Sequence, residues 1–342
     1  MTSSRERVID ALLTSAEPSI RWKTRVAVLG ESPASRRLRA LREEIRTSSR
    51  VHALLSRRTH LGRPGTARQV YYKWQGLHWV LASLADLGYP EGDDSLFPIR
   101  DRVVAFWTDA RYFHEFDAKN EAAAYRGRGV PRMRGRYRRC ASQQGNALRA
   151  VMLLRLDDDR ADVLAERLLH WQWPDGGWNC DRHPEADTSS FHETWLAMLG
   201  LAVYGSARKH RGATDAAQRA TQVFLKRRLF KRVSDGTVMQ RDFVRLHYPH
   251  YWHYDVLAGL TAMAQLGRIR DRRCAEALDL LEERRLADGG WPADARYYKV
   301  SPRAMVTNAD YMEWGKTSRS RMNEWVTVEA LTALATARRF AA

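Results

Sequence analysis

An internal repeat constrains this chain more than any other feature of its sequence. The segment AERLLHWQWPDGGW, residues 165–178, aligns without a gap with LDLLEERRLADGGW, residues 278–291. Halfway between the two copies, another helix-like segment ends in an Asp-Gly turn at Asp235 and Gly236, so the repeating unit is about 56 residues long. A repeated unit of this size buries its apolar face by stacking on its neighbours, which favours one continuous core over separate domains.

Each unit is predicted to contain two helices of different character. The first begins with polar and aromatic residues and then becomes apolar on most sides, as in KWQGLHWVLASLADLGY from Lys73; similar segments begin at residues 140, 189, 250 and 323. The second, such as DRRCAEALDLLEERRL from Asp271, is amphipathic. A helix that is apolar all round is buried, whereas an amphipathic helix lies at the surface.

The two helix types together predict an all-α fold, and more narrowly an α/α toroid in which an inner ring of buried helices is surrounded by an outer ring. We expect five to six helical hairpins over residues 51–342, preceded by an N-terminal helical segment over residues 1–50 that either closes the ring or lies outside it. The polar first turns of the inner helices are expected to meet at the mouth of a central cavity.

The repeated turn also carries a resemblance. The residues QWPDGGW, Gln172 to Trp178, resemble the QxxxGxW motif of squalene and other triterpene cyclases, and of the wider prenyltransferase-like α/α-toroid superfamily. The second copy has Arg285 in the place of the Gln. The repeat pattern extends over roughly residues 50–338 and implies a fold more than a reaction, with the glycines forming a tight turn and the Trp packing against the next outer helix.

The chain departs from these enzymes in its acidic motifs. It does not contain the DxDD acid motif of the cyclases. The cluster of Asp157, Asp158 and Asp159 falls at an inner-to-outer turn, where we interpret it as a helix N-cap. The resemblance therefore implies an atypical member of the superfamily, with isoprenoid cyclisation or isomerisation as the expected chemistry.

The net charge of the chain suggests an anionic partner, but it does not by itself indicate a nucleic-acid-binding protein. The formal net charge is +17, and 49 of the 57 basic residues are Arg, spread along the sequence. Such a surface attracts an anionic membrane or a diphosphate group, but no zinc-finger spacing or RNA-binding aromatic motif accompanies it. The polar start MTSSRERVID and the three cysteines favour a cytoplasmic protein.

The strongest candidate site is the run from His247 to Asp255, HYPHYWHYD, at the start of a predicted inner helix. We interpret Asp255 as a general acid or base, with His253 or His250 tuning it. In the alternative interpretation, Asp255 caps the helix or forms an ion pair in its first turn while the aromatic residues pack.

A second run, SSFHETW, places His192 and Glu193 at the same expected mouth. Ser190 and Glu193 have the spacing of a capping box, which would account for both without catalysis. His192 is predicted either to form a simple hydrogen bond or to act in catalysis opposite Asp255.

The cysteines suggest a metal. Cys140, Cys180 and His192, with Asp181 as a further candidate ligand, predict a zinc site with an open position. Protein prenyltransferases and lanthionine cyclases are similar in using zinc with Cys and His ligands, although their ligand motifs are absent here. Cys140 and Gln143 also have the spacing of the internal thioester in complement-type toroids, without the flanking GCGEQ sequence.

The expected mouth is rich in aromatic residues, whose faces stabilise cations when water is excluded. In the alternative, these residues simply fill the core. The side chains predicted to bind substrate are Trp74, Gln75, His78, Cys140, Gln143, His250, Tyr251 and Trp325.

The sequence thus predicts a terpene cyclase-like or prenyltransferase-like enzyme that acts on a small apolar molecule by general acid–base chemistry and needs no cofactor. Two alternatives stay open. The first is a Zn²⁺-dependent enzyme that modifies thiols or peptides, and the second is a basic, non-catalytic scaffold.

Overall fold

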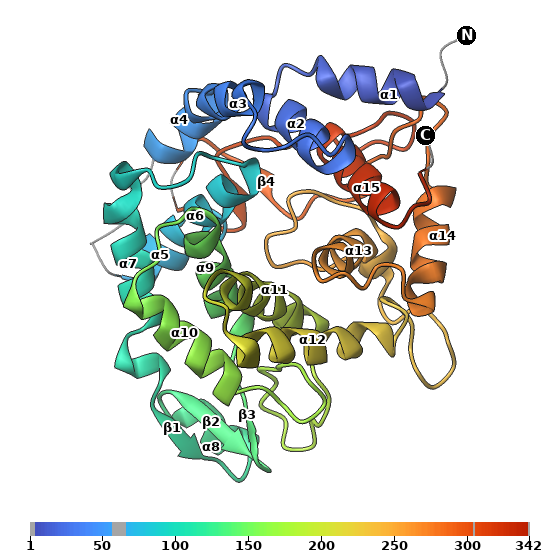
Figure 1. The fold of residues 1–342 in the computed structure, drawn as a ribbon. Helices are drawn as coiled ribbons and strands as arrows, with labels where there is room; N and C mark the ends of the chain where they lie inside the picture. The colour runs from blue at the N-terminus through green and yellow to red at the C-terminus, as the bar shows by residue number, and fades with distance from the viewer. Residues whose placement is uncertain (1–3, 57–65, 304, 341–342) are drawn as a thin grey trace.

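A computed structural model describes residues 4–56, 66–303 and 305–340. The described residues are mostly helical, which confirms the all-α prediction, and two very small sheets lie among the connections (Figure 1). Among these residues, no helix has both the length and the apolar character needed to cross a membrane.

The first group of helices lies toward the middle of the molecule in Figure 1. It includes all five segments that the sequence predicts as inner helices, and it gains one member from the N-terminal segment. The group consists of α2 (Pro18–Lys23), which continues as the π-helix η1 (Thr24–Val28), α6 (Leu77–Leu87), α9 (Ala141–Leu153), α11 (Phe191–Ala207), α13 (Val256–Gln265) and α15 (Glu324–Thr336).

The second group lies toward the periphery in the same view. Its long members are α1 (Ser4–Leu13), α3 (Arg36–Arg46), α4 (Ser49–Ser56), α7 (Phe97–Trp107), α10 (Asp159–His170), α12 (Arg211–Leu225) and α14 (Ala275–Glu283). The short helices are α5 (Ala67–Tyr71) and α8 (Glu121–Arg126), with 3₁₀ turns η2 (Asp94–Leu96), η3 (Ala110–Tyr112), η4 (Arg241–Val244) and η5 (Arg272–Cys274). As predicted from the Asp cluster, Asp158 caps α10 by accepting a hydrogen bond from the Arg160 amide.

Neighbouring inner helices approach closely where both carry glycine. A Cβ atom on Gly200 of α11 would lie 2.3 Å from the Gly145 carbonyl oxygen of α9. A Cβ atom on Gly145 would lie 2.3 Å from the Ala197 Cα atom. Both glycines are therefore required by the contact between the backbones rather than by a turn.

The two copies of the repeated turn form equivalent contacts. Gln172 donates from Nε2 to the Gly176 carbonyl at 2.7 Å, and Arg285 donates from Nε to the Gly289 carbonyl at 3.1 Å, so the Arg takes over the role of the Gln. The Trp178 indole donates to the Leu168 carbonyl of the preceding outer helix, α10, at 2.9 Å. Gln172 instead reaches the next outer helix, α12, through the carbonyl of residue 216.

The N-terminal helices share the core of the rest of the chain. Val8, Leu12, Ile20 and Ile45 belong to the same buried cluster as the inner helices. The end of α2 lies between α6 and α15, with which its last residue, Lys23, forms ion pairs. Residues 4–50 therefore pack as part of the helical body described here.

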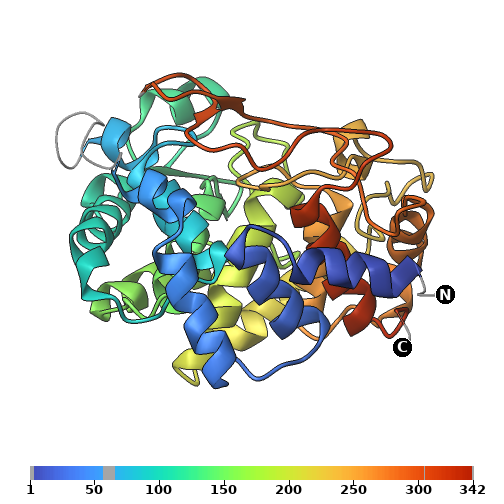
Figure 2. The ribbon, with the colours of Figure 1, turned by 90° about the horizontal axis from the view of Figure 1, so that it is seen from above.

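Two small sheets were missed by the sequence analysis. β1 (Glu115–Asp117) runs parallel to β2 (Val130–Met133), with Glu115 opposite Val130, and β2 pairs antiparallel with β3 (Arg136–Tyr137). β4 (Lys299–Val300) runs parallel to β5 (Ala309–Asp310). Strands of two to four residues are too short to show alternation. Figure 2 shows that the long connections, including residues 290–303 and 305–323, gather at one end of the inner helices.

Candidate functional site

A cavity of about 250 Å³ lies among the inner helices and is lined by side chains from all six of them. Its lining contains charged and polar groups together with apolar ones. The lining residues used below are Lys23, Asp86, Asn146, Arg149, Trp195, Leu196, Leu199, Tyr248, His250, Tyr251, Trp314 and Glu329.

Lys23 joins two carboxylates across the cavity. Its Nζ atom lies 3.0 Å from the Asp86 Oδ2 atom on α6 and 3.7 Å from the Glu329 Oε1 atom on α15. The Tyr248 hydroxyl also donates to Asp86 Oδ2. One amino group therefore holds two carboxyl groups from different helices within reach of the same small space.

The pKa values of Asp86 and Glu329 are shifted in opposite directions. Burial opposes the charge of Asp86, but the cations of Lys23 and Arg149 outweigh it and lower the pKa of Asp86 to about 2. Burial dominates at Glu329 and raises its pKa, even though His250 and Lys23 act in the opposite direction. A pair of carboxyl groups whose pKa values are driven apart is suited to separate roles as base and acid.

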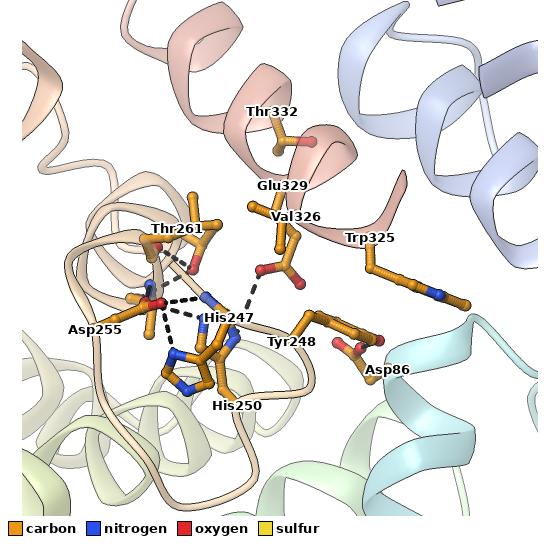
Figure 3. Close-up of polar contacts among 12 residues, drawn as sticks. Asp86, His247, Tyr248, His250, Asp255, Thr261, Trp325, Val326, Glu329 and Thr332 are labelled. Atoms are coloured by element: carbon orange, nitrogen blue, oxygen red, sulfur yellow. Dashed lines mark hydrogen bonds and ion pairs between the residues drawn. The ribbon is translucent and has the colours of Figure 1, made fainter. Parts of the chain in front are cut away.

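His250 links Glu329 to the buried Asp255 (Figure 3). Its Nε2 atom lies 3.1 Å from Asp255 Oδ1, and its Nδ1 atom lies 3.6 Å from Glu329 Oε2. Burial by itself would lower the pKa of His250, but the carboxylates of Asp255 and Glu329 outweigh it and raise this pKa to about 9. The imidazole is therefore a cation at neutral pH.

Asp255 is fully buried and caps α13. It accepts hydrogen bonds from the backbone amides of Ala258 (2.8 Å) and His247 (3.0 Å), and the His247 Nδ1 atom lies 2.9 Å away. Burial opposes its charge, but His250 and His247 outweigh burial and hold its pKa far below the usual range. Asp255 thus orients His250 from behind and does not line the cavity.

The raised pKa of His250 predicts a stability that depends on pH. The imidazolium contributes fully below the unfolded pKa of about 6.5, and its contribution is lost as pH rises toward about 9. We expect the free energy of unfolding to fall by up to about 3 kcal/mol over this window. Urea denaturation at several pH values will measure the loss, which should shrink in His250→Gln and persist in His52→Gln, at an exposed position on α4. An identical pH slope in His250→Gln would refute the assignment.

Arg149 is a cation of the cavity that forms no direct ion pair, although its charge contributes to the lowered pKa of Asp86. It forms no ion pair within 4 Å among residues 4–56, 66–303 and 305–340, and its Nε atom is buried without a hydrogen-bond partner there. An unpaired guanidinium that faces a cavity is a binding group for an anion, because it presents a fork of donors that matches carboxylate and phosphate.

The structure corrects three expectations about the predicted catalytic residues. His253 does not pair with Asp255; its ring stacks on Tyr297 with centroids 4.3 Å apart, and burial lowers its pKa to about 3. His192 stacks on Trp252 at 4.5 Å, and burial lowers its pKa to about 4. Glu193 forms no capping box, because Ser190 makes no capping bond through its side chain.

Of the residues predicted to bind substrate, His250 and Tyr251 line the cavity. Trp74 stacks on Tyr251 at 4.8 Å and Trp325 stacks on Tyr248 at 4.9 Å, so both lie behind the cavity wall.

Four others lie away from the cavity. Gln75 donates to the Arg303 carbonyl at 2.9 Å. His78 is fully buried and accepts from the Trp107 indole at 3.1 Å, and burial lowers its pKa to about 3. Cys140 belongs to a separate cluster that contains two thiols, and Gln143 lies near that cluster.

That cluster contains Cys140, Cys180 and Glu193, whose possible ligand atoms lie within 4.8 Å of one another. The grouping differs from the predicted zinc ligands in one member, since Glu193 and not His192 lies beside the two thiols. A hydrogen bond with Cys140, followed by burial, raises the pKa of the Cys180 thiol, and burial raises that of Glu193. A second group that meets the same distance limit, His247, His250 and Asp255, is fully buried and internally paired.

Four charged residues of the cavity were not predicted from the sequence: Lys23, Asp86, Arg149 and Glu329. A signal for two of them exists, because Asp86 is the one charged residue of α6 and Arg149 the one charged residue of α9. A single charged residue in an otherwise apolar, buried helix is expected either to form an ion pair or to serve a function.

Comparison of the whole chain with protein-family models finds no match, and comparison with curated proteins finds none either.

Proposed function

We propose that this chain is an enzyme of the α/α-toroid class that performs general acid–base chemistry on a small molecule bound in the cavity between its inner helices. The observation that carries the proposal is the pair of carboxyl groups, Asp86 and Glu329, that Lys23 holds together in a cavity to which every inner helix contributes.

The toroid arrangement is supported by the order of contacts around the molecule. Each inner helix packs against the next along the chain, from α6 through α9, α11 and α13 to α15. Helix α15 packs against α2 and η1, and Lys23 at the end of α2 pairs with Asp86 of α6. On this proposal the N-terminal segment supplies the last inner helix and closes the ring.

The acid and base roles follow from the environments of the two carboxyl groups. Glu329, whose pKa is raised by burial, is assigned as the group that delivers a proton to the substrate. Asp86, whose pKa lies at about 2, is ionised at neutral pH and accepts a proton. His250 lies beside Glu329, and its imidazolium stabilises the Glu329 carboxylate that forms after proton transfer.

The lining of the cavity suggests the class of substrate. Trp195, Leu196 and Leu199 of α11 form an apolar wall, and Arg149 offers an unpaired cation. A molecule with a short apolar part and one anionic group satisfies both. The volume of about 250 Å³ lies just below the range of roughly 300–1,000 Å³ for drug-sized ligands, which favours a small substrate.

A short prenyl diphosphate has this composition, and the resemblance of the repeated turn to the triterpene cyclases and prenyltransferases points to the same class. Tyr248, Tyr251 and Trp314 add aromatic faces that favour a developing positive charge. This chemistry requires no cofactor in the cavity.

The test is incubation of the full chain with prenyl diphosphates of increasing length, with products followed by mass spectrometry and binding by calorimetry. We expect conversion of a short member, and an increase in KM of about 10- to 100-fold in Arg149→Gln from the loss of a charge-assisted hydrogen bond.

Arg155→Gln provides the matched control, because Arg155 follows the same helix but is exposed. Absence of both conversion and binding across the panel would exclude this substrate class. An unchanged KM in Arg149→Gln would exclude the anion site.

A further inference from the structure

A second constellation of reactive side chains lies outside the cavity, where three structural elements meet. Cys140 is the N-cap residue of α9, Cys180 follows the repeated turn that ends at Trp178, and Glu193 lies in the first turn of α11. Their possible ligand atoms lie within 4.8 Å of one another. From this geometry we propose that Cys140, Cys180 and Glu193 bind a zinc ion and leave a fourth coordination position open.

The spacing of the donors suits a tetrahedral ion. Zinc binds thiolate sulfur at about 2.3 Å and carboxylate oxygen at about 2.0–2.2 Å, which separates neighbouring ligand atoms by roughly 3.5 Å. The Cys180 Sγ atom lies 3.5 Å from the Glu193 Oε1 atom. Two thiolates and one carboxylate therefore reach a common ion with little rearrangement.

Backbone contacts hold the two cysteines side by side. The residues that precede them form a bridge, in which the Arg139 amide donates to the Asn179 carbonyl at 3.2 Å. The neighbouring residue, Arg138, forms an isolated β-bridge with Asn179. The two thiol-bearing segments are therefore aligned by hydrogen bonds, and the site does not depend on a loose loop.

The third ligand is oriented by its own hydrogen bonds. Glu193 Oε2 accepts from the Ser142 amide at 3.1 Å and from the Ser142 hydroxyl at 2.8 Å. These bonds leave Oε1 on the side of Cys180. Hydrogen bonds that fix a ligand carboxylate in this way are typical of metal sites, where they set the orientation of the ligand.

Arg139 balances the charge of the site. Two thiolates, one carboxylate and Zn²⁺ together carry a single negative charge. The guanidinium of Arg139 is close enough to interact electrostatically with all three ligands, and its Nη2 atom is buried with no hydrogen-bond partner among the described residues. A buried cation beside a site with one excess negative charge offsets the free-energy cost of burying that charge.

The open position gives the site a chemical role distinct from that of the cavity. A zinc ion with three protein ligands and one exchangeable position activates a bound water or thiol. The proposal does not rest on the acid–base function of the cavity, since it involves none of the residues assigned there.

The test is metal analysis of the full chain, purified with a reducing agent and without chelators, then loaded with zinc and desalted. We expect one zinc per chain by elemental analysis, falling to below about a tenth in Cys180→Ser and in Glu193→Gln. Cobalt substitution should give the near-ultraviolet absorption of thiolate ligation and the visible absorption of a tetrahedral ion in the wild type, with both lost in Cys180→Ser.

Two variants serve as controls. Cys274→Ser removes a buried thiol of the outer turn η5, and His192→Gln removes the histidine next to Glu193; both should retain one zinc per chain. Circular dichroism verifies that each variant is folded. A wild-type chain that retains no zinc after loading, or a folded Cys180→Ser variant that keeps it, would overturn the proposal. Loss of zinc in His192→Gln would overturn the ligand assignment.

Discussion

Replacement of Glu329 by Gln is expected to lower the turnover of the substrate identified in the prenyl diphosphate panel by about 10²- to 10⁴-fold, the range for loss of one general acid. Gln has nearly the same shape as Glu but cannot transfer a proton. The effect should appear mainly in kcat, because Arg149 and the apolar wall of α11 remain to bind the substrate. Steady-state kinetics and product analysis provide the measurement.

The matched control is Glu324→Gln on the same helix. Glu324 lies in the first turn of α15, where it accepts a hydrogen bond from the Ser15 hydroxyl, and it does not line the cavity. Turnover in this variant should stay within a factor of a few of the wild type. If Glu329→Gln retains the same kcat as Glu324→Gln, then Glu329 is not the acid.

The pH dependence of turnover gives a second test of the acid. Only the protonated form of Glu329 can donate a proton, so kcat should fall as pH rises through the pKa of Glu329, which burial raises above its usual value. The limb on the alkaline side should disappear in the residual activity of Glu329→Gln.

Replacement of Asp255 by Asn is expected to lower the free energy of unfolding by about 3–5 kcal/mol, the cost of breaking a buried ion pair by removing one partner. Asn retains the shape and the capping oxygen. However, the side-chain NH2 group of Asn would face hydrogen-bond donors, because Asp255 accepts a hydrogen bond from the His247 backbone amide and is paired with the rings of His247 and His250. Urea denaturation at pH 7 measures the loss.

Asp158→Asn is the control for the capping role. Asp158 caps the outer helix α10 and is partly exposed, and Asn caps a helix almost as well as Asp, so we expect a loss below about 1 kcal/mol. Equal losses in the two variants would mean that Asp255 acts as a cap alone. An Asp255→Asn variant should also lose most of the decline in stability between pH 6.5 and 9, because His250 then lacks the carboxylate that raises its pKa.

Local patterns in the sequence were sufficient to predict most of the long helices. The inner helices α6, α9, α11, α13 and α15 were recognised because each is apolar on most sides, and the outer helices because their charges lie on one face. The repeated turn was recognised from seven residues, and its second copy keeps the same contacts with Arg285 in place of Gln172. The short strands were not predicted, because their pairing depends on segments that the fold brings together.

The candidate sites were only partly predictable, as two neighbouring residues illustrate. His192 and Glu193 are adjacent, yet side chains of successive residues on a helix point about 100° apart. One of them therefore stacks on Trp252 while the other meets Cys180. The order of residues identified the right turn of α11, but the rotation of the helix against its neighbours determined which side chain joins the thiols.

The cavity was determined by the tertiary structure alone. Lys23, Asp86 and Glu329 are separated by long stretches of sequence and belong to three different helices. The sequence by itself determined that α6 and α15 are buried, because their burial follows from local composition. Only the packing of the helices determined that the three charges meet, since their distance depends on the register and rotation of helices that are remote in the chain.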